Sequence, residues 1–196
     1  MQTNQKDKDS SLFEDLALLY EYPTEELIPV ISLLIKKFST NSNNLLVPII
    51  EKLRIFFDYC SSNTLAKLEE DYIATYEMNT KYILYIGHLL FGENYERSEF
   101  ISQLQHLYDE NDFKIDQNEL PDHISVILKF LSKKTVSKSN KRKLMENILA
   151  SFRQENNAKD KQDQTYLMNL NEDNKYPLLY FLLTDLVEVF KIWEIE

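Results

Sequence analysis

With 196 residues, 43% of them hydrophobic and 12% aromatic, the chain is long enough to bury a core and too apolar to be disordered. Its formal net charge of -10 disfavours nucleic acid, which is bound through basic side chains, and favours basic partners. Only two glycines are present, Gly87 and Gly92, which disfavours sheets with tight turns and glycine-rich phosphate loops. The composition predicts an all-α protein.

The two ends of the first helix and the start of the second are marked by local signals. Ser11 and Glu14 form a capping box that predicts a helix start, and Pro23 is predicted to end this helix. Thr24 is predicted to cap the second helix, and Pro29 to bend or delay it. The apolar positions at helical spacing here are Leu12, Leu16, Leu19, Tyr20, Leu27, Ile31, Leu34, Ile35 and Phe38.

Two more helices are predicted before residue 80. The polar residues 39–44 predict a loop, with Asn44 as the cap of a third helix that runs to about Cys60. Thr64 is predicted to open a fourth helix. The apolar faces of the two would hold Leu45, Ile49, Leu53, Phe56 and Phe57, and then Leu65, Leu68, Tyr72 and Tyr76. As the only cysteine, Cys60 excludes an intramolecular disulfide and is predicted to be a buried thiol.

The middle of the chain predicts three helices. Residues 81–90 are apolar almost all round, which is typical of a central helix, and Gly92 is well placed to stop it. A sixth helix follows, then a loop over residues 111–118, and Leu120-Pro-Asp122 is predicted to begin a seventh helix that ends near Leu131. The core face of the sixth helix would hold Phe100, Ile101, Leu104 and Leu107.

The last part of the chain predicts two helices on either side of a charged segment. Residues 156–164 are predicted to be mobile, and the final helix covers about residues 176–193. The predicted core positions are Leu144, Ile148 and Phe152, and then Leu179, Leu182, Leu183, Leu186, Val189, Phe190 and Trp193.

Without strand patterns or repeats, the sequence predicts disordered residues 1–10 and one helical bundle domain over 11–196. It would be a monomer, or a dimer that exchanges helices.

No targeting or membrane segment is predicted. Residues 1–10 lack the apolar stretch of a secretory signal, and no apolar run approaches the ~20 residues that a membrane helix needs. The expectation is a soluble, cytoplasmic protein without stable membrane insertion.

No residue pattern predicts catalysis or a cofactor. His88, His106 and His123 lie far apart, without the spacing that places two metal ligands on one helix face. Glu70 and Glu77 could share a helix face, either as a solvated acidic surface or as an acidic rim beside a groove.

Four tyrosines suggest that groove. Tyr72 and Tyr76 lie on the predicted fourth helix, and Tyr82 and Tyr85, three residues apart, would share a face of the fifth. Such an aromatic stripe is either core or a recognition surface for a basic amphipathic peptide. A basic run, Lys129, Lys133, Lys134, Lys138, Lys141, Arg142 and Lys143, could meet an anionic membrane or be a solvated loop and helical turn.

Four motifs at characteristic distances carry a family resemblance, over about residues 68–131. They are Tyr72-x-x-Thr-Tyr-Glu77, Leu84-Tyr85, Gly92-Glu-x-x-x-Arg97 and, most specific, Glu119-Leu-Pro-Asp-His123. The chain resembles the NarJ branch of the TorD/DmsD chaperones. Departures are Glu77, Ser98 and Ser125, where that family often has Asp, Gly and Pro.

The resemblance implies an all-helical cytoplasmic chaperone that is not an enzyme. Such proteins bind the N-terminal segment of an apo molybdenum-containing catalytic subunit, here NarG-like, and assist cofactor insertion before membrane attachment. The residues it implies for peptide binding are Tyr72, Thr75, Tyr76, Glu77, Tyr82, Tyr85, Glu119, Pro121, Asp122 and His123.

The residue types of the Glu119–His123 segment suggest individual roles. Pro121 fits a first helical turn, and Asp122 would complement the positive end of that helix. Glu119 and Asp122 could pair with a basic client residue, and His123 could respond to pH or be structural. Alternatively, the whole segment is a joint that shapes the groove without touching the client.

Three other functions stay open. The same fold could serve another molybdoenzyme, of the dimethyl sulfoxide, selenate or hydrocarbon-hydroxylating type. A helical hydrolase with a carboxylate or metal site is a different class. A helical scaffold could bind its partner through the C-terminal helix, which carries Trp193.

Overall fold

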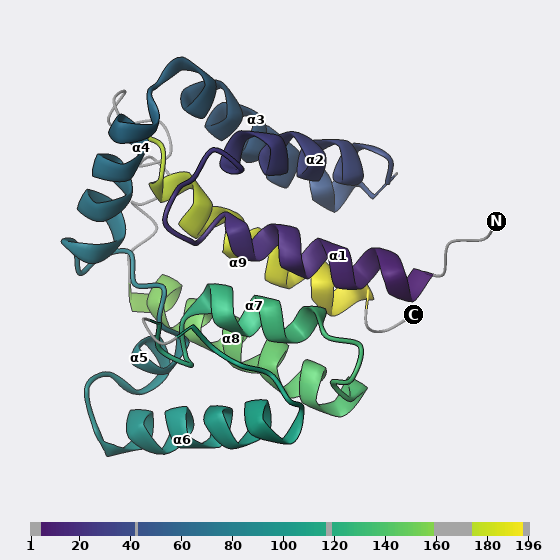
Figure 1. The fold of residues 1–196 in the computed structure, drawn as a ribbon, viewed down its shortest axis with the longest axis vertical. Coiled ribbons are helices and arrows are strands. Elements are labelled where there is room, and N and C mark those ends of the chain that lie inside the picture. The colour runs from purple at the N-terminus through teal and green to yellow at the C-terminus, as the bar shows by residue number, and fades with distance from the viewer. Residues whose placement is uncertain (1–4, 42, 117–118, 159–173, 194–196) are drawn as a thin grey trace. The chain divides into compact units, whose positions relative to one another are not determined.

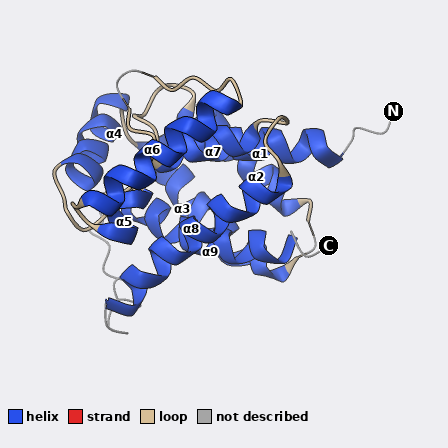
Figure 2. Cartoon of the chain, turned by 90° about the horizontal axis from the view of Figure 1, so that it is seen from below, coloured by secondary structure: helices blue, strands red, loops and turns tan. Residues whose placement is uncertain are grey.

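Every regular element of the described chain is helical (Figures 1 and 2). The computed structural model describes residues 5–41, 43–116, 119–158 and 174–193. Within these ranges there are nine α-helices, one 3-10 turn and one π-helix, so the predicted all-α class is confirmed. The chain forms two compact units: unit 1 holds residues 1–20 and 84–154, and unit 2 holds residues 21–83 and 155–196. One domain over residues 11–196 stays a prediction.

Unit 1 is built around α7 (Ile124–Ser132), in which every side chain except Lys129 is buried. Helix α1 (Gln5–Leu18) lies along α7, and α5 (Ile86–Phe91) packs on α6 (Tyr95–Glu110) (Figure 1). Most of α8 (Lys138–Ala158) belongs to this unit. The central apolar helix is therefore α7 and not the predicted segment 81–90.

The predicted bounds of the first helix are wrong. Helix α1 begins at Gln5, which places Ser11 inside it, and it ends at Leu18, five residues before Pro23. Its predicted core positions are nevertheless buried, because Leu12, Leu16, Leu19 and Tyr20 are at most 8% exposed.

Unit 2 contains α2 (Leu27–Ser39), α3 (Val47–Ser62), α4 (Leu65–Tyr72) and α9 (Pro177–Trp193). Helix α3 packs against both α2 and α9. The side chain of Asn43, rather than the predicted Asn44, caps the 3-10 turn before α3 by accepting a hydrogen bond from the Leu45 amide at 3.0 Å. Pro29 falls in the first turn of α2, where its missing N–H costs nothing, and the helix is not delayed beyond it.

The start of α4 confirms a sequence prediction, and its end does not. The hydroxyl of Thr64 accepts a hydrogen bond from the Lys67 amide at 3.3 Å, as expected of an N-cap. After Tyr72 the chain continues as a π-helix, Ile73–Glu77, in which the Met78 amide donates to the Ile73 carbonyl at 2.9 Å. This wider turn was not predicted.

Residues 81–85 are not helical, contrary to the prediction of a helix over 81–90. The Leu84 carbonyl accepts from the Ile124 amide at 2.9 Å, and the Ile86 amide donates to the Asp122 carbonyl at 2.8 Å. These two bonds pair the segment with the loop before α7 in an isolated antiparallel bridge. Helix α5 therefore begins only at Ile86, and Gly92, with φ of 71°, ends it as predicted.

Burial follows most of the predicted core. In α8 and α9, Leu144, Ile148, Phe152, Leu179, Leu182, Leu183, Leu186 and Val189 are buried. The prediction is wrong for Leu45 and Leu65, because 47% and 36% of their surfaces are exposed. The side chains of Phe190 and Trp193, and most of the predicted mobile segment 156–164, lie outside the described residues. None of the described helices is both long and apolar enough to span a membrane.

Candidate functional site

The Glu119–His123 segment is a turn that precedes α7. Pro121 and Asp122 form the turn, and His123 is the N-cap, whose Nδ1 accepts from the Ser125 amide at 3.4 Å. The prediction that Pro121 stands in the first helical turn is therefore wrong. The hydroxyl of Tyr108, which the sequence did not single out, donates to the Pro121 carbonyl at 2.9 Å and so fixes this turn to α6.

Asp122 is completely buried, and its partner is Arg97 rather than the start of α7. The Arg97 Nε lies 3.1 Å from Asp122 Oδ2, while Asp122 Oδ1 has no hydrogen-bond partner within the described part of the chain. A Cβ atom at Gly87 would come within 2.8 Å of Asp122 Oδ2 and 2.9 Å of the Phe100 ring. Glycine at position 87 therefore lets the backbone of α5 lie directly against the buried carboxylate.

Arg97 contacts both the buried Asp122 carboxylate and an exposed carboxylate. Its Nη1 lies 2.6 Å from Oε1 of the exposed Glu93, which is also 2.8 Å from His88 Nδ1. The hydrogen bond from His88 and the positive charge of Arg97 lower the pKa of Glu93. The guanidinium also lies 5.6 Å from the centre of the Tyr85 ring. Arg97 belonged to the motif behind the family resemblance, but not to the predicted site residues.

Tyr85 and Glu119 complete the group in unit 1. The phenol of Tyr85 donates to Glu119 Oε1 at 3.2 Å, and the Leu120 amide donates to the same oxygen at 2.9 Å. Burial and the nearby Glu119 charge raise the pKa of Tyr85 to about 12, so the phenol remains a donor. Leu120, by contrast, is 45% exposed and offers an apolar side chain to solvent.

His123 is held in the neutral state. Burial lowers its pKa to about 4, and Ser125 Oγ lies 2.8 Å from its Nδ1. Glu119 Oε2, at 3.8 Å from the same nitrogen, is thus no ion-pair partner at neutral pH. A response of His123 to pH is expected only in acid.

Tyr72 and Tyr76 belong to an aromatic cluster in unit 2. The Tyr176 ring lies 5.7 Å from Tyr72, 5.9 Å from Tyr76 and 5.1 Å from Phe56, measured between ring centres. The Tyr76 hydroxyl also donates to the Tyr176 carbonyl at 2.8 Å. Tyr72 is buried and Tyr76 half-buried, so this stripe is largely core.

Thr75 lies on the inner side of the π-helix. Its hydroxyl donates to the Asp71 carbonyl at 2.7 Å and accepts from Asn174 Nδ2 at 3.0 Å. The Asn174 Oδ1 accepts from the Tyr176 amide at 2.9 Å, just before α9. Asn174 therefore connects the π-helix to the start of α9, which sequence patterns could not reveal.

One face of this aromatic cluster reaches solvent. Tyr22 is 47% exposed, lies 5.6 Å from the Tyr72 ring, and has its pKa raised by partial desolvation and by the charges of Glu69 and Glu77. Met78 is 79% exposed at the end of the π-helix. We call Tyr22, Glu69, Tyr76, Glu77 and Met78 the aromatic–acidic surface. Tyr22 was not among the predicted site residues.

Tyr82 and Tyr85 do not share a face. Tyr82 is buried in unit 2, and the centre of its ring lies 5.5 Å from that of Tyr180 and 6.4 Å from that of Phe181. Tyr85 lies in unit 1 beside His123. The prediction failed because it assumed a helix over residues 81–85.

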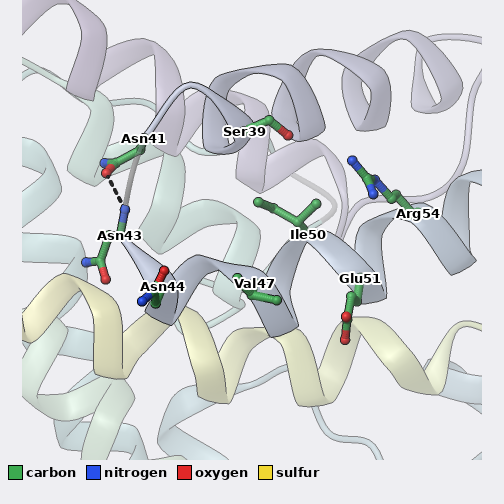
Figure 3. A pocket seen from close by; sticks show the side chains of 8 residues that line it. All are labelled: Ser39, Asn41, Asn43, Asn44, Val47, Ile50, Glu51 and Arg54. Carbon is green, nitrogen blue, oxygen red and sulfur yellow. Dashed lines mark hydrogen bonds between the residues drawn. The ribbon is translucent and has the colours of Figure 1, made fainter.

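A separate hollow lies between the end of α2 and the start of α3 (Figure 3). Its volume is about 340 Å³, and side chains of both polar and apolar type line it: Ser39, Asn41, Asn43, Asn44, Val47, Ile50, Glu51 and Arg54. None of these is a predicted site residue, so the hollow is not part of the candidate site.

The described residues offer little for metal or thiol chemistry. No group of three or more His, Cys, Asp or Glu side chains among them is placed to hold a metal ion. Burial raises the pKa of Cys60 to about 12, which keeps the thiol protonated and unreactive.

Comparison with known proteins gives the family. The profile of the family described as nitrate reductase delta subunit matches residues 37–171, more than half of the chain. The chain belongs to this family. A protein of Bacillus subtilis (strain 168), named as a probable nitrate reductase molybdenum cofactor assembly chaperone, NarJ, is 27% identical over 157 residues, which cover 79% of this chain and 81% of that protein.

A solved structure shows the same fold. The crystal structure of a protein from Archaeoglobus fulgidus, named as a putative redox enzyme maturation protein, is similar over 96% of both chains, with a TM-score of 0.52 and 16% sequence identity. This similarity confirms the predicted fold, and the profile match confirms the predicted family.

Proposed function

We propose that this chain is a chaperone that binds the N-terminal segment of the apo molybdenum-containing subunit of a nitrate reductase. It acts in the cytoplasm, by binding alone, and keeps the subunit accessible for cofactor insertion before membrane attachment. The observation that carries the proposal is membership of the nitrate reductase delta subunit family over residues 37–171. The extensive match to the Bacillus subtilis NarJ protein supports it.

We place the main contact with the client on the aromatic–acidic surface of unit 2. Tyr22 and Met78 offer exposed apolar and polarizable area, and Glu69 and Glu77 supply negative charge beside it. A basic amphipathic segment matches this arrangement, because its apolar side can cover the ring and the thioether while its cations meet the carboxylates.

Unit 1 offers a second, smaller contact at Leu120. This side chain is exposed, whereas Pro121, Asp122 and His123 are buried below it. The buried residues then act by fixing the turn, and Leu120 with the half-exposed Glu119 touches the client. This assigns different roles to the members of the predicted peptide-binding segment.

Calorimetric titration of the full chain with a synthetic peptide of the client's N-terminal segment tests the proposal. Tyr22→Ala should weaken binding at least tenfold, as loss of an anchoring aromatic side chain does. Glu77→Gln should weaken it severalfold and reduce its salt dependence. Tyr95→Ala is the matched control, because Tyr95 is 78% exposed on α6, and it should bind like the parent chain.

Three outcomes are informative. No binding by the parent chain would contradict the proposed function itself. If the parent chain binds and the Tyr22→Ala and Tyr95→Ala variants bind equally well, the proposed function stands. The proposal that the client contacts the aromatic–acidic surface is then refuted. Leu120→Ala should reduce affinity about threefold, and an unchanged affinity would remove unit 1 from the client site.

A further inference from the structure

The strongest charge asymmetry of the chain lies in unit 1, in the basic run that follows the Glu119–His123 segment in the sequence. Residues 128–144 contain seven basic residues and no acidic one, and no Asp or Glu occurs between Asp122 and Glu146. The other 179 residues hold 15 basic and 32 acidic residues. A solvated surface that served only solubility would be expected to mix both signs.

The structure concentrates this charge at the turn between α7 and α8 (Figure 1). The exposed members, which we call the basic corner, are Lys133, Lys134, Lys138, Arg142 and Lys143. The turn is anchored by the buried Val136, and Ser137 Oγ accepts from the Asn140 amide at 3.2 Å at the start of α8. The positive side chains therefore stand on a fixed corner of the fold.

Some of these cations also have contacts within the fold; the Lys133 Nζ, for example, lies 5.9 Å from the centre of the Phe113 ring. Lys141 has a structural role, because its Nζ donates to the Leu131 carbonyl at 2.6 Å and closes the end of α7. The first turn of α8, however, carries no acidic side chain and begins with Lys138, although a helix start favours negative charge. Positive charge there opposes helix stability, and a negative partner would offset this.

We propose that the basic corner docks on an anionic phospholipid membrane. Four of the five residues of the basic corner are lysines, which act as point charges on flexible stems and suit a diffuse negative surface better than a single phosphate or carboxylate. Attraction between the corner and anionic headgroups acts over about one Debye length, about 8 Å at physiological salt. Docking would bring the chaperone to the surface where its client is finally attached.

Sedimentation of the full chain with vesicles tests this. Vesicles of phosphatidylglycerol and phosphatidylcholine should bind the chain at low salt, and pure phosphatidylcholine vesicles should not. Each neutralised cation should lower the partition coefficient about fivefold, so K133Q/K134Q/K138Q together should lower it about 100-fold. The control K36Q/R54Q/K114Q removes three exposed cations elsewhere and the same net charge, and should bind like the parent chain.

Further arms distinguish the alternatives. K133R/K134R/K138R should retain binding and show that charge, rather than fold, is responsible; equal thermal midpoints by circular dichroism confirm folding. Equal losses in the two neutralised triples would overturn the proposal, as would equal binding to both vesicle types. So would displacement from vesicles by millimolar inorganic phosphate, which indicates a phosphate site, or tighter binding to duplex DNA at the same salt.

Discussion

At the scale of single residues, the site in unit 1 depends on one guanidinium that holds two very different carboxylates. Asp122 is fully buried, whereas 71% of the Glu93 side chain is exposed. A buried charge without its partner is costly, while an exposed ion pair contributes little because water and salt screen it. Loss of the ion pair with Asp122 should therefore cost much more stability than loss of the ion pair with Glu93.

We expect Arg97→Gln to lower the free energy of unfolding by about 3 kcal/mol, because it leaves the Asp122 carboxylate buried without its cation. Glu93→Gln is the matched control and should change it by less than about 0.5 kcal/mol. Urea unfolding followed by circular dichroism measures both. Asp122→Asn in the Arg97→Gln background should restore part of the loss; equal effects of Arg97→Gln and Glu93→Gln would refute this assignment.

His123 predicts a pH dependence with a definite sign. Its pKa is about 4 in the folded chain and about 6.5 when unfolded, so protons favour unfolding. The stability that His123 contributes is fully present above about pH 6.5 and is lost as the pH falls toward 4. Between pH 7 and pH 5 it should account for about 2 kcal/mol.

His123→Asn tests this because asparagine is a good N-cap that does not titrate. Urea unfolding of the variant should lose about 2 kcal/mol less between pH 7 and pH 5 than the parent chain does. Identical losses in both proteins would show that His123 does not titrate on unfolding.

At the scale of elements, the π-helix and α9 are connected through Asn174. The Asn174 side chain donates a hydrogen bond to the Thr75 hydroxyl and accepts one from the Tyr176 backbone amide. We expect Asn174→Ala to lower the free energy of unfolding by about 2 kcal/mol, because two hydrogen bonds at buried or half-buried groups are lost. Asn43→Ala, which removes an exposed cap, should cost about 1 kcal/mol or less.

Hydrogen exchange locates the effect of Asn174→Ala. Amides in residues 73–78 and at the start of α9 should exchange faster than in the parent chain, while those of α7 should not. Uniform acceleration throughout unit 2 would mean that Asn174 stabilises the unit as a whole rather than this connection.

Helices were predictable from the sequence where apolar spacing and caps agree. Thr64 and Gly92 were placed correctly because their signals depend only on neighbouring residues. Residues 81–85 were not, because their apolar character suits a helix and only the distant Ile124 and Asp122 pair them otherwise. The burial of Asp122 likewise depends on Arg97 and Gly87, which no local pattern connects to it.

At the scale of the whole molecule, the two units are linked by three passages of the chain. These lie after residues 20, 83 and 154. With three covalent links, we expect the units to unfold cooperatively, which also tests the predicted single domain. Cys60, the one thiol, is buried in unit 2 and reports its opening.

We expect the Cys60 thiol to react with a disulfide reagent only when the chain unfolds. Arg97→Gln, although it lies in unit 1, should then speed labelling of Cys60 by the factor that corresponds to its loss of stability, about 100-fold for about 3 kcal/mol. Glu93→Gln should not. If Arg97→Gln destabilises unit 1 by circular dichroism and leaves the labelling rate unchanged, the units are independent domains.

The π-helix affects how this segment should be aligned with related sequences. Its turn, closed by the bond from the Met78 amide to the Ile73 carbonyl, holds one residue more than an α-helical turn. A homologue in which residues 65–77 wind as a plain α-helix would reach the same end point with one residue fewer. If the two sequences were aligned without a gap, every position after Ile73 would be shifted by one. Tyr76 would then be aligned with a residue that does not correspond to it. Placing a single-residue gap within residues 73–77 restores the correspondence, and it makes the position of that gap a marker for sorting relatives into lineages.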